Sequence, residues 1–400
     1  MAVTFPPNPN VGDTVTDTVT GAVWVWNGTA WVPQGSSAGT FLPTAGGTMT
    51  GPIVMSGAGS NITLPGNVTQ PLQAPPLQQV MALDGNNIGR NYIHNAQFNI
   101  NQRGATSYTQ TPPWMVYCPD RWAMILGNTG DSGTLNWLEV SDGGRATIGD
   151  ESAEMFAQVQ NFVGGSGATN VVMFVQRIED VYRLANKTCM LSFWAYAGTA
   201  GLRVGVSWGQ DFGAGGSPSA AVSANAAVVT LSTLWVRYTV PITFPSVAGM
   251  VLGTTPNTSY SQISFWLSCP PANTASYPIS GNLGAQSGSA SFWGVQLELG
   301  SSATPLEHRD PELDLALCQR FFLATFFSIG TYNEGGQNSA YVQPFPVVMR
   351  AGPTLVPSNT SIFNGTPILQ SNNTGMSVGV AVTTQAVAWY NGDVIASADL

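Results

Sequence analysis

Apolar and polar positions alternate over several short stretches in the middle of the chain. At 293–299, apolar side chains occupy every second position, which is the period of a strand with one wet face. Apolar runs rich in branched and aromatic residues occur at 190–196, 202–208, 235–244 and 263–267, separated by turn-forming residues. Short strands separated by turns predict a β-sandwich or jelly roll.

The N-terminal residues 1–40 have a hairpin pattern of their own. Short apolar runs at 23–26 and 30–32 flank Asn27-Gly28, and this dipeptide between alternating apolar residues is a strong hairpin signal. We therefore expect a small β module, acting either as a simple hairpin or as a docking module. Its small core would be supplied by three tryptophans, Trp24, Trp26 and Trp31.

Helical spacing is limited to two short segments. Residues 70–83 have apolar side chains near helical spacing, and residues 311–322 suit one short amphipathic helix with Pro311 and Glu312 at its start. Residues 34–76 are dominated by glycine, serine, threonine and proline and cannot form a core as a single chain. That stretch is either a flexible linker or a slender shaft in which identical chains supply each other's contacts.

The composition favours strands and excludes several classes of partner. Charged residues make up 8% of the chain, against about one quarter in an average protein, and there is a single lysine, Lys187. Few charges with many Thr, Val, Trp and Tyr indicate an all-β chain. The net charge of -9 is thinly spread, so we expect no nucleic-acid partner. Without a long apolar stretch or a signal-like N-terminus, we expect neither membrane insertion nor a secretion signal.

The cysteines and histidines do not have the spacing of a metal or redox site. Two histidines, His94 and His308, are too few for a typical zinc site, so any calcium would need carboxylates and carbonyls. We predict no cofactor. Four widely spaced cysteines are expected to be buried free thiols: Cys118, Cys189, Cys269 and Cys318.

The glycine-rich stretch contains a motif that resembles a known repeat. Residues 40–53 read Thr-Phe-Leu-Pro-Thr-Ala-Gly-Gly-Thr-Met-Thr-Gly-Pro-Ile. This closely resembles a short repeat of bacteriophage tail fibres, where it usually belongs to an intertwined trimeric β shaft. The resemblance implies a thin trimeric shaft with a short connector helix over residues 41–90, and an N-terminal module at 1–40 that attaches to other virion proteins.

The long middle segment, residues 91–310, resembles a sandwich domain of phage tail proteins. That domain is itself similar to carbohydrate-binding modules, so the resemblance implies a carbohydrate-binding-module-like β-sandwich. Two later segments, residues 314–322 and 345–353, resemble other recurring sequence motifs of these proteins. This implies a short helix and a C-terminal β trimerisation region over 311–400. The sandwich resemblance is carried by residues 91–104, 120–122, 176–188, 191–195, 212–219 and 295–300.

Candidate catalytic residues are sparse. A glycosidase needs two acids across one sugar bond, and the acidic cluster of Asp150, Glu151 and Glu154 is better explained as a solvated turn. Glu179 and Asp180 are explained by helix capping and salt bridges. His94 and His308 have no nearby Ser or Cys motif, and no nucleophile elbow or phosphate loop appears. We therefore predict no catalytic residues and a protein that is not an enzyme.

A glycine-rich loop after the 202–208 run is the candidate ligand site. A sugar ring presents an apolar face to aromatic side chains and hydroxyls to Asp, Asn, Gln or Arg. The loop supplies both kinds of group through Trp208, Gln210, Asp211 and Phe212. In the structural alternative, Trp208 and Phe212 fill the core while Asp211 ties the loop together.

Together these patterns and resemblances predict a structural virion protein. We expect a phage tail fibre or spike that is a homotrimer, is located in the virion as a tail or capsid appendage, and is assembled in the host bacterial cytoplasm. Its sandwich would bind a host cell-surface glycan. Two alternatives stay open: a purely structural connector or decoration protein without receptor binding, and a polysaccharide-degrading enzyme.

Overall fold

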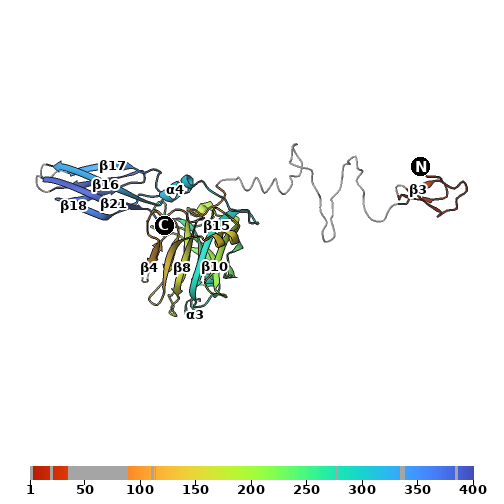
Figure 1. The fold of residues 1–400 in the computed structure, drawn as a ribbon, viewed down its shortest axis with the longest axis horizontal. Coiled ribbons are helices and arrows are strands. Elements are labelled where there is room, and N and C mark those ends of the chain that lie inside the picture. The colour runs from red at the N-terminus through yellow and green to blue at the C-terminus, as the bar shows by residue number, and fades with distance from the viewer. Residues whose placement is uncertain are drawn as a thin grey trace. The chain divides into compact units, whose positions relative to one another are not determined.

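A computed structural model describes residues 3–18, 21–34, 89–109, 112, 114–274, 278–333, 338–382 and 386–400 (Figure 1). The described chain is mostly β, with antiparallel strands and a few short helices, which confirms the all-β prediction. It forms two units, residues 1–66 and 67–400. The shaft expected at 41–90 and the helix expected at 70–83 lie outside the described residues, except for residues 89 and 90.

The first unit contains the predicted hairpin. Its two strands pair Trp26 with Trp31, and the side chain of Asn27 accepts hydrogen bonds from the backbone of the turn, which confirms the Asn-Gly prediction. The rings of Trp26 and Trp31 lie 5.7 Å apart, and Phe5 stacks on Trp31 at 5.2 Å. A further strand makes this a three-stranded sheet of β1 (Thr14–Thr16), β2 (Val23–Trp26) and β3 (Trp31–Pro33).

The second unit begins with a sandwich of two six-stranded sheets (Figure 1). Sheet I has the order β13-β10-β15-β8-β7-β4, and sheet II the order β12-β11-β14-β9-β6-β5. The strands are β4 (Ser107–Thr109), β5 (Trp114–Tyr117), β6 (Ala123–Leu126), β7 (Ser132–Glu139), β8 (Met155–Val163), β9 (Val172–Glu179), β10 (Lys187–Ala197), β11 (Arg203–Asp211), β12 (Val222–Thr230), β13 (Val236–Phe244), β14 (Tyr260–Ser268) and β15 (Ser287–Leu299). Short helices α2 (Asp142–Ile148), η1 (Val181–Arg183), α3 (Pro271–Thr274) and η2 (Pro278–Ser280) lie in the connections.

Aromatic side chains fill the space between the two sheets. Trp122 stacks on Phe174 at 4.8 Å, and Phe265 lies 4.8 Å from both Phe193 and Phe292, each distance joining ring centroids. All five are fully buried. Large rings that alternate along paired strands therefore build this core, as the strand period requires.

The prediction that 293–299 has one wet face is wrong. The side chains of Gln296 and Glu298 are 0% and 2% exposed. Glu298 accepts from the backbone and hydroxyl of Thr304, and Gln296 accepts from the backbone N–H of Glu307. The segment after β15 covers this face, and the buried polar groups are satisfied by it.

The C-terminal part consists of one helix and two three-stranded sheets. Sheet III has the order β16-β21-β18 and sheet IV the order β17-β20-β19, with an apolar core that includes Phe327, Val378 and Tyr390. The predicted helix at 311–322 is confirmed, although β16 already begins at residue 322. The elements are α4 (Pro311–Gln319), β16 (Phe322–Asn333), β17 (Asn338–Pro344), β18 (Thr354–Phe363), β19 (Thr366–Ser371), β20 (Gly375–Ala381) and β21 (Ala386–Ser397).

Arginines connect the sandwich to the C-terminal sheets. Arg320 donates to both carboxylate oxygens of Glu179 at 2.9 Å, and the carbonyl of Arg350 accepts from Nδ2 of Asn257 at 2.9 Å. Arg103 pairs with Asp399 at 2.6 Å. These contacts fix sheet III beside the loop that precedes β4.

Two further expectations concern the cysteines and the membrane. All four cysteines are free and buried, as predicted. Among the helices that the structure describes, none is long and apolar enough to cross a membrane.

Candidate ligand-binding site

The four predicted ligand residues lie at the end of β11 and just beyond it. Strand alternation turns Trp208 and Gln210 towards the interior, where the Trp208 ring lies 5.5 Å from that of Phe244. Gln210 and Phe212 are each 1% exposed, and Asp211 accepts a hydrogen bond from the backbone N–H of Gly213 at 2.8 Å. These positions fit the structural alternative weighed from the sequence, and the ligand role of the four residues stays a prediction.

Asp211 and Gln210 also line a small hollow on sheet II, with Tyr260 and Gln262 of β14. Its volume is about 140 Å³. Arg177 lies with its guanidinium 4.6 Å from the centre of the Tyr260 ring. This hollow is much smaller than a typical small-molecule pocket of about 300 to 1,000 Å³.

A larger cleft, of about 420 Å³, lies where the sandwich meets sheet III. We call it the sandwich–sheet III cleft. The loop before β4, the first residues of β16, a bulge in β18 and the end of β21 all contribute to it. Its lining consists of Gln102, Arg103, Tyr108, Phe322, Ala324, Ser358, Asn359, Asp393 and Ile395.

Arg103 is held rigidly on the sandwich side of the cleft. Its guanidinium lies 3.7 Å from the centre of the Phe322 ring and donates to Asp399 at 2.6 Å. The Nε of Arg103 is buried and has no hydrogen-bond partner. A stacked, paired guanidinium loses little freedom when it binds a further acceptor.

The opposite side of the cleft presents a carboxylate beside an amide. A bulge in β18 between Ser358 and Ser361 inserts one extra residue opposite β21. At that point Asn359 Nδ2 donates to Asp393 Oδ2 at 3.2 Å. Gly392 allows this approach, because a Cβ there would lie only 2.7 Å from Thr360 Cα.

Tyr108 and Gln102 add hydrogen-bonding groups with fixed roles. Burial raises the pKa of Tyr108, so its hydroxyl stays protonated and can donate at neutral pH. The amide of Gln102 donates to Asp120 Oδ2 at 2.6 Å and to the carbonyl of Phe322 at 2.9 Å. Burial raises the pKa of Asp120 to about 6.

The chemistry of the cleft suits binding of a neutral polar ligand. Tyr108 supplies ring surface, while Arg103, Asn359 and Asp393 supply donors and acceptors. Asp393 is the one carboxylate among the residues that line it, whereas glycoside hydrolysis commonly uses two.

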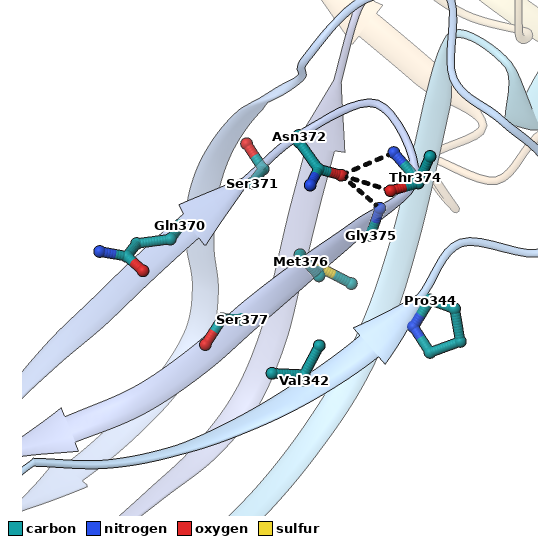
Figure 2. Close-up of a pocket in the computed structure, with 9 residues that line it drawn as sticks. All are labelled: Val342, Pro344, Gln370, Ser371, Asn372, Thr374, Gly375, Met376 and Ser377. Carbon is teal, nitrogen blue, oxygen red and sulfur yellow. Dashed lines mark hydrogen bonds between the residues drawn. The ribbon is translucent and has the colours of Figure 1, made fainter.

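A second hollow, of about 390 Å³, lies on the outer face of sheet IV (Figure 2). Asn372 Oδ1 closes its upper end by accepting from the backbone N–H of Gly375 and from both the N–H and the hydroxyl of Thr374. None of the residues that line it is titratable, so acid–base chemistry is not available there. We call it the sheet IV groove, and its lining is Val342, Pro344, Gln370, Ser371, Asn372, Thr374, Gly375, Met376 and Ser377.

The structure also brings His308 beside Asp150 of the acidic cluster and the neighbouring Ser152. His308 Nε2 lies 3.1 Å from Asp150 Oδ2, and its Nδ1 lies 3.2 Å from Ser152 Oγ. Ser152 Oγ also donates to Asp150 Oδ1 at 2.7 Å. The histidine thus contacts both the serine and the aspartate, but the direct bond between Ser152 and Asp150 and the half-exposed ring differ from the buried relay of a catalytic triad.

The described residues contain no group of three or more His, Cys, Asp or Glu side chains that could hold a metal ion. Sequence reasoning missed the sandwich–sheet III cleft, because its members come from 102–108, 322–324, 358–359 and 393–395. Only Gln102, Arg103 and Phe322 fall within motifs singled out from the sequence, and no local pattern indicates that β18 carries a bulge there.

No protein-family model matches the chain, and no curated protein matches it. Among solved structures, it is similar to the enzymatically active domain of tailspike protein 4 of bacteriophage CBA120, with 12% identity and a TM-score of 0.27 over 53% of this chain and 22% of that one. The chain thus spans about a fifth of that domain.

Carbohydrate-binding modules are matched over nearly their whole length. The family 11 module from Clostridium thermocellum, in complex with a β-1,3-1,4-mixed-linked tetrasaccharide, shows 13% identity and a TM-score of 0.27 over 51% of this chain and 99% of that one. A xylan-binding domain from Paenibacillus barcinonensis shows 11% identity and a TM-score of 0.28 over 52% and 97%. At TM-scores this low, the likenesses carry no argument about function.

Proposed function

We propose that this chain is a glycan-binding appendage protein of a bacteriophage, a tail fibre or spike that attaches to the host cell surface. The observation that carries the proposal is the composition of the sandwich–sheet III cleft, which is lined by the Tyr108 ring together with a guanidinium, an amide and a carboxylate. The tail-fibre motif at 40–53 and the sandwich motifs from 91 onwards support the viral assignment. As such a protein, it would be located in the virion after assembly in the bacterial cytoplasm.

The protein binds its glycan without cleaving it. A single carboxylate lines the cleft, and in the Asp150–Ser152–His308 cluster the hydroxyl bonds directly to the carboxylate while the ring is half-exposed. Incubation of the protein with a bound polysaccharide should therefore release no reducing ends. Steady release of reducing ends would show that the protein is an enzyme.

The same proposal includes assembly as a homotrimer through the C-terminal region. The sheet IV groove is lined by uncharged residues, and Val342 at its rim is 70% exposed. Because each chain carries a net charge of -9, an uncharged face is where copies can approach without repulsion. Weak binding at one cleft would then be strengthened by several copies acting together.

Binding of the purified full-length protein to an array of bacterial surface glycans tests the proposal. Asp393→Ala and Tyr108→Ala should each weaken binding at least tenfold, since each removes one kind of contact from the cleft. Asp211→Ala is the matched control, because it changes the loop indicated by the sequence and leaves the cleft intact. Loss of binding in the control alone would move the site to sheet II, and no binding by the natural chain would refute the proposal.

A further inference from the structure

The outer face of sheet III carries large aromatic side chains that the fold leaves uncovered. Along β16, Leu323 and Phe327 point into the C-terminal core, so strand alternation turns Phe326 and Tyr332 outwards. Both of these rings are 62% exposed. We call this surface the aromatic face of sheet III; β16, β18 and β21 form it at the left of Figure 1.

A stacked pair of rings on this face joins the central strand, β21, to the last residue of β18. Trp389 pairs in register with Gly330 on one side and with Phe363 on the other. The ring centroids of Phe363 and Trp389 are 5.9 Å apart with an interplanar angle of 16°. Phe363 is 46% and Trp389 36% exposed. Since Gly330 has no side chain, the neighbouring strand leaves one side of the indole open.

Polar residues separate this pair from the sandwich–sheet III cleft. The next row across the sheet is Ser328, Asn391 and Ser361, and the row after that contains Asp393 of the cleft. Trp389 and Asp393 are four residues apart on one strand, which corresponds to about 13 Å at 3.3 Å per residue. The face is thus continuous with the cleft and longer than a single sugar ring.

The alternation of rings and polar groups decides between two occupants. A second copy of the chain packed here would bury the Ser328, Asn391 and Ser361 side chains, and burial of unpaired polar groups is costly. A glycan chain offers ring faces to the aromatic row and hydroxyls to the polar row. Among the described residues of this face, Asp393 is the one charged side chain. A surface with so little charge suits a neutral ligand.

Resting on the proposed function, we infer that the aromatic face of sheet III extends the cleft into an elongated site for a glycan chain of several sugars. One end of the chain occupies the sandwich–sheet III cleft. Its continuation crosses the polar row and stacks on Phe363 and Trp389. The site therefore selects for chain length, whereas the cleft alone would bind single sugars and chains alike.

The test uses full-length protein with purified bacterial capsular and O-antigen polysaccharides, and then with short and long fragments cut from each polysaccharide that binds. Long fragments should bind the natural chain about tenfold more tightly than single-sugar fragments, the gain expected from stacking on two rings. Trp389→Ala should lose that gain and keep the affinity for short fragments. Phe363→Ala, whose ring is more exposed, repeats the test with less risk to folding. Tyr182→Ala is the control, since its ring is 55% exposed on the sandwich.

Three results would overturn the inference. Equal affinity for short and long fragments would show that the site ends at the cleft, and so would unchanged binding by both sheet III variants. A fall in molecular mass of Trp389→Ala in light scattering would show that the face joins copies of the chain. Absence of any binding by the natural chain is different, because it would refute the proposed function as well.

Discussion

Single buried side chains tie together segments of the sandwich that are far apart in the sequence. Asp131, which is 3% exposed, accepts four backbone hydrogen bonds, from the N–H groups of Gly127, Asn128, Gly165 and Val171. One carboxylate thus accepts hydrogen bonds from backbone N–H groups of two separate loops. Buried donors of this kind are costly to leave without a partner.

Replacing this carboxylate by an amide tests its role. Asp131→Asn places an NH₂ group opposite backbone donors and should lower the free energy of unfolding by about 2 kcal/mol. Thermal or denaturant unfolding measures the change. Glu151→Gln, the same chemical change at an exposed position, should have no measurable effect. Equal stability of Asp131→Asn and the natural chain would contradict this role.

His94 is a second buried residue with a testable consequence. Burial lowers its pKa well below 6.5, and Arg121, Arg309, Arg183 and Arg320 lower it further. The imidazole is therefore neutral in the folded protein, while the unfolded chain takes up a proton as the pH falls below about 6.5. Because the unfolded state binds the extra proton, this histidine makes the folded protein less stable as the pH falls.

Unfolding temperatures between pH 7.5 and pH 5 measure this effect. Relative to His94→Leu, the natural chain should lose stability as the pH falls below about 6.5, while Asp120, whose pKa burial raises to about 6, acts in the opposite direction in both proteins. His94→Leu cannot take up the proton and should show a smaller loss. His308→Gln is the control, because that ring is half-exposed and should leave the contribution of His94 unchanged. An identical pH profile for His94→Leu and the natural chain would refute the assignment.

At the residue scale, the sequence identifies the kinds of side chain but not where they point. Trp208 and Asp211 have the chemistry of a sugar site, and in the structure Trp208 packs against the core while Asp211 ties a turn. Whether a ring points outwards depends on strand register, and register depends on partner strands far along the chain. The exposed rings of Phe363 and Trp389 were not singled out for the same reason.

Among the elements, β21 and the residues after it join the C-terminal sheets to the sandwich. Asp399 follows β21 and pairs with Arg103 at 2.6 Å and with Arg121 at 3.8 Å. The side chain of Arg121 is only 2% exposed. Burial lowers the pKa of Arg121, and Asp399 is the first of the groups that raise it again.

Removing this carboxylate should loosen the connection. Asp399→Ala leaves two buried guanidinium groups without their partner and should cost about 3 kcal/mol of stability. The side chain of Asp393, within β21, accepts from the amide of Asn359, so Asp393→Ala should reduce glycan binding while changing stability little. Chemical denaturation measures the stability of each variant and the glycan-binding assay measures its affinity, so the two effects are distinguished. The connection is wrongly assigned if Asp399→Ala is as stable as Asp393→Ala.

At the element scale, the sequence was a good guide where the pattern is local. The Asn-Gly hairpin and the helix beginning at Pro311 are set by residues adjacent in sequence, and both are confirmed. The wet face expected at 293–299 was wrong, because the segment after β15 folds back over it. A strand pattern reveals its period but not what later covers each face.

For the whole molecule, the sheet IV groove is the proposed contact between copies. Val342→Asp would place a carboxylate at the rim of this groove, and a buried unpaired charge is strongly unfavourable. Light scattering should therefore show a trimer for the natural chain and a smaller species for the variant. Leu234→Asp, at a position 66% exposed on the sandwich, should remain trimeric. A monomeric natural chain would contradict the trimer.

Amide hydrogen exchange with and without the polysaccharide that binds best is the most direct test of where the glycan sits. The account predicts slower exchange in residues 101–109, in the first residues of β16, at the bulge of β18 and at 389–395. Exchange around 208–217 should be unchanged. Protection confined to 208–217 and the adjoining strands of sheet II would instead contradict the account and place the glycan on the loop indicated by the sequence.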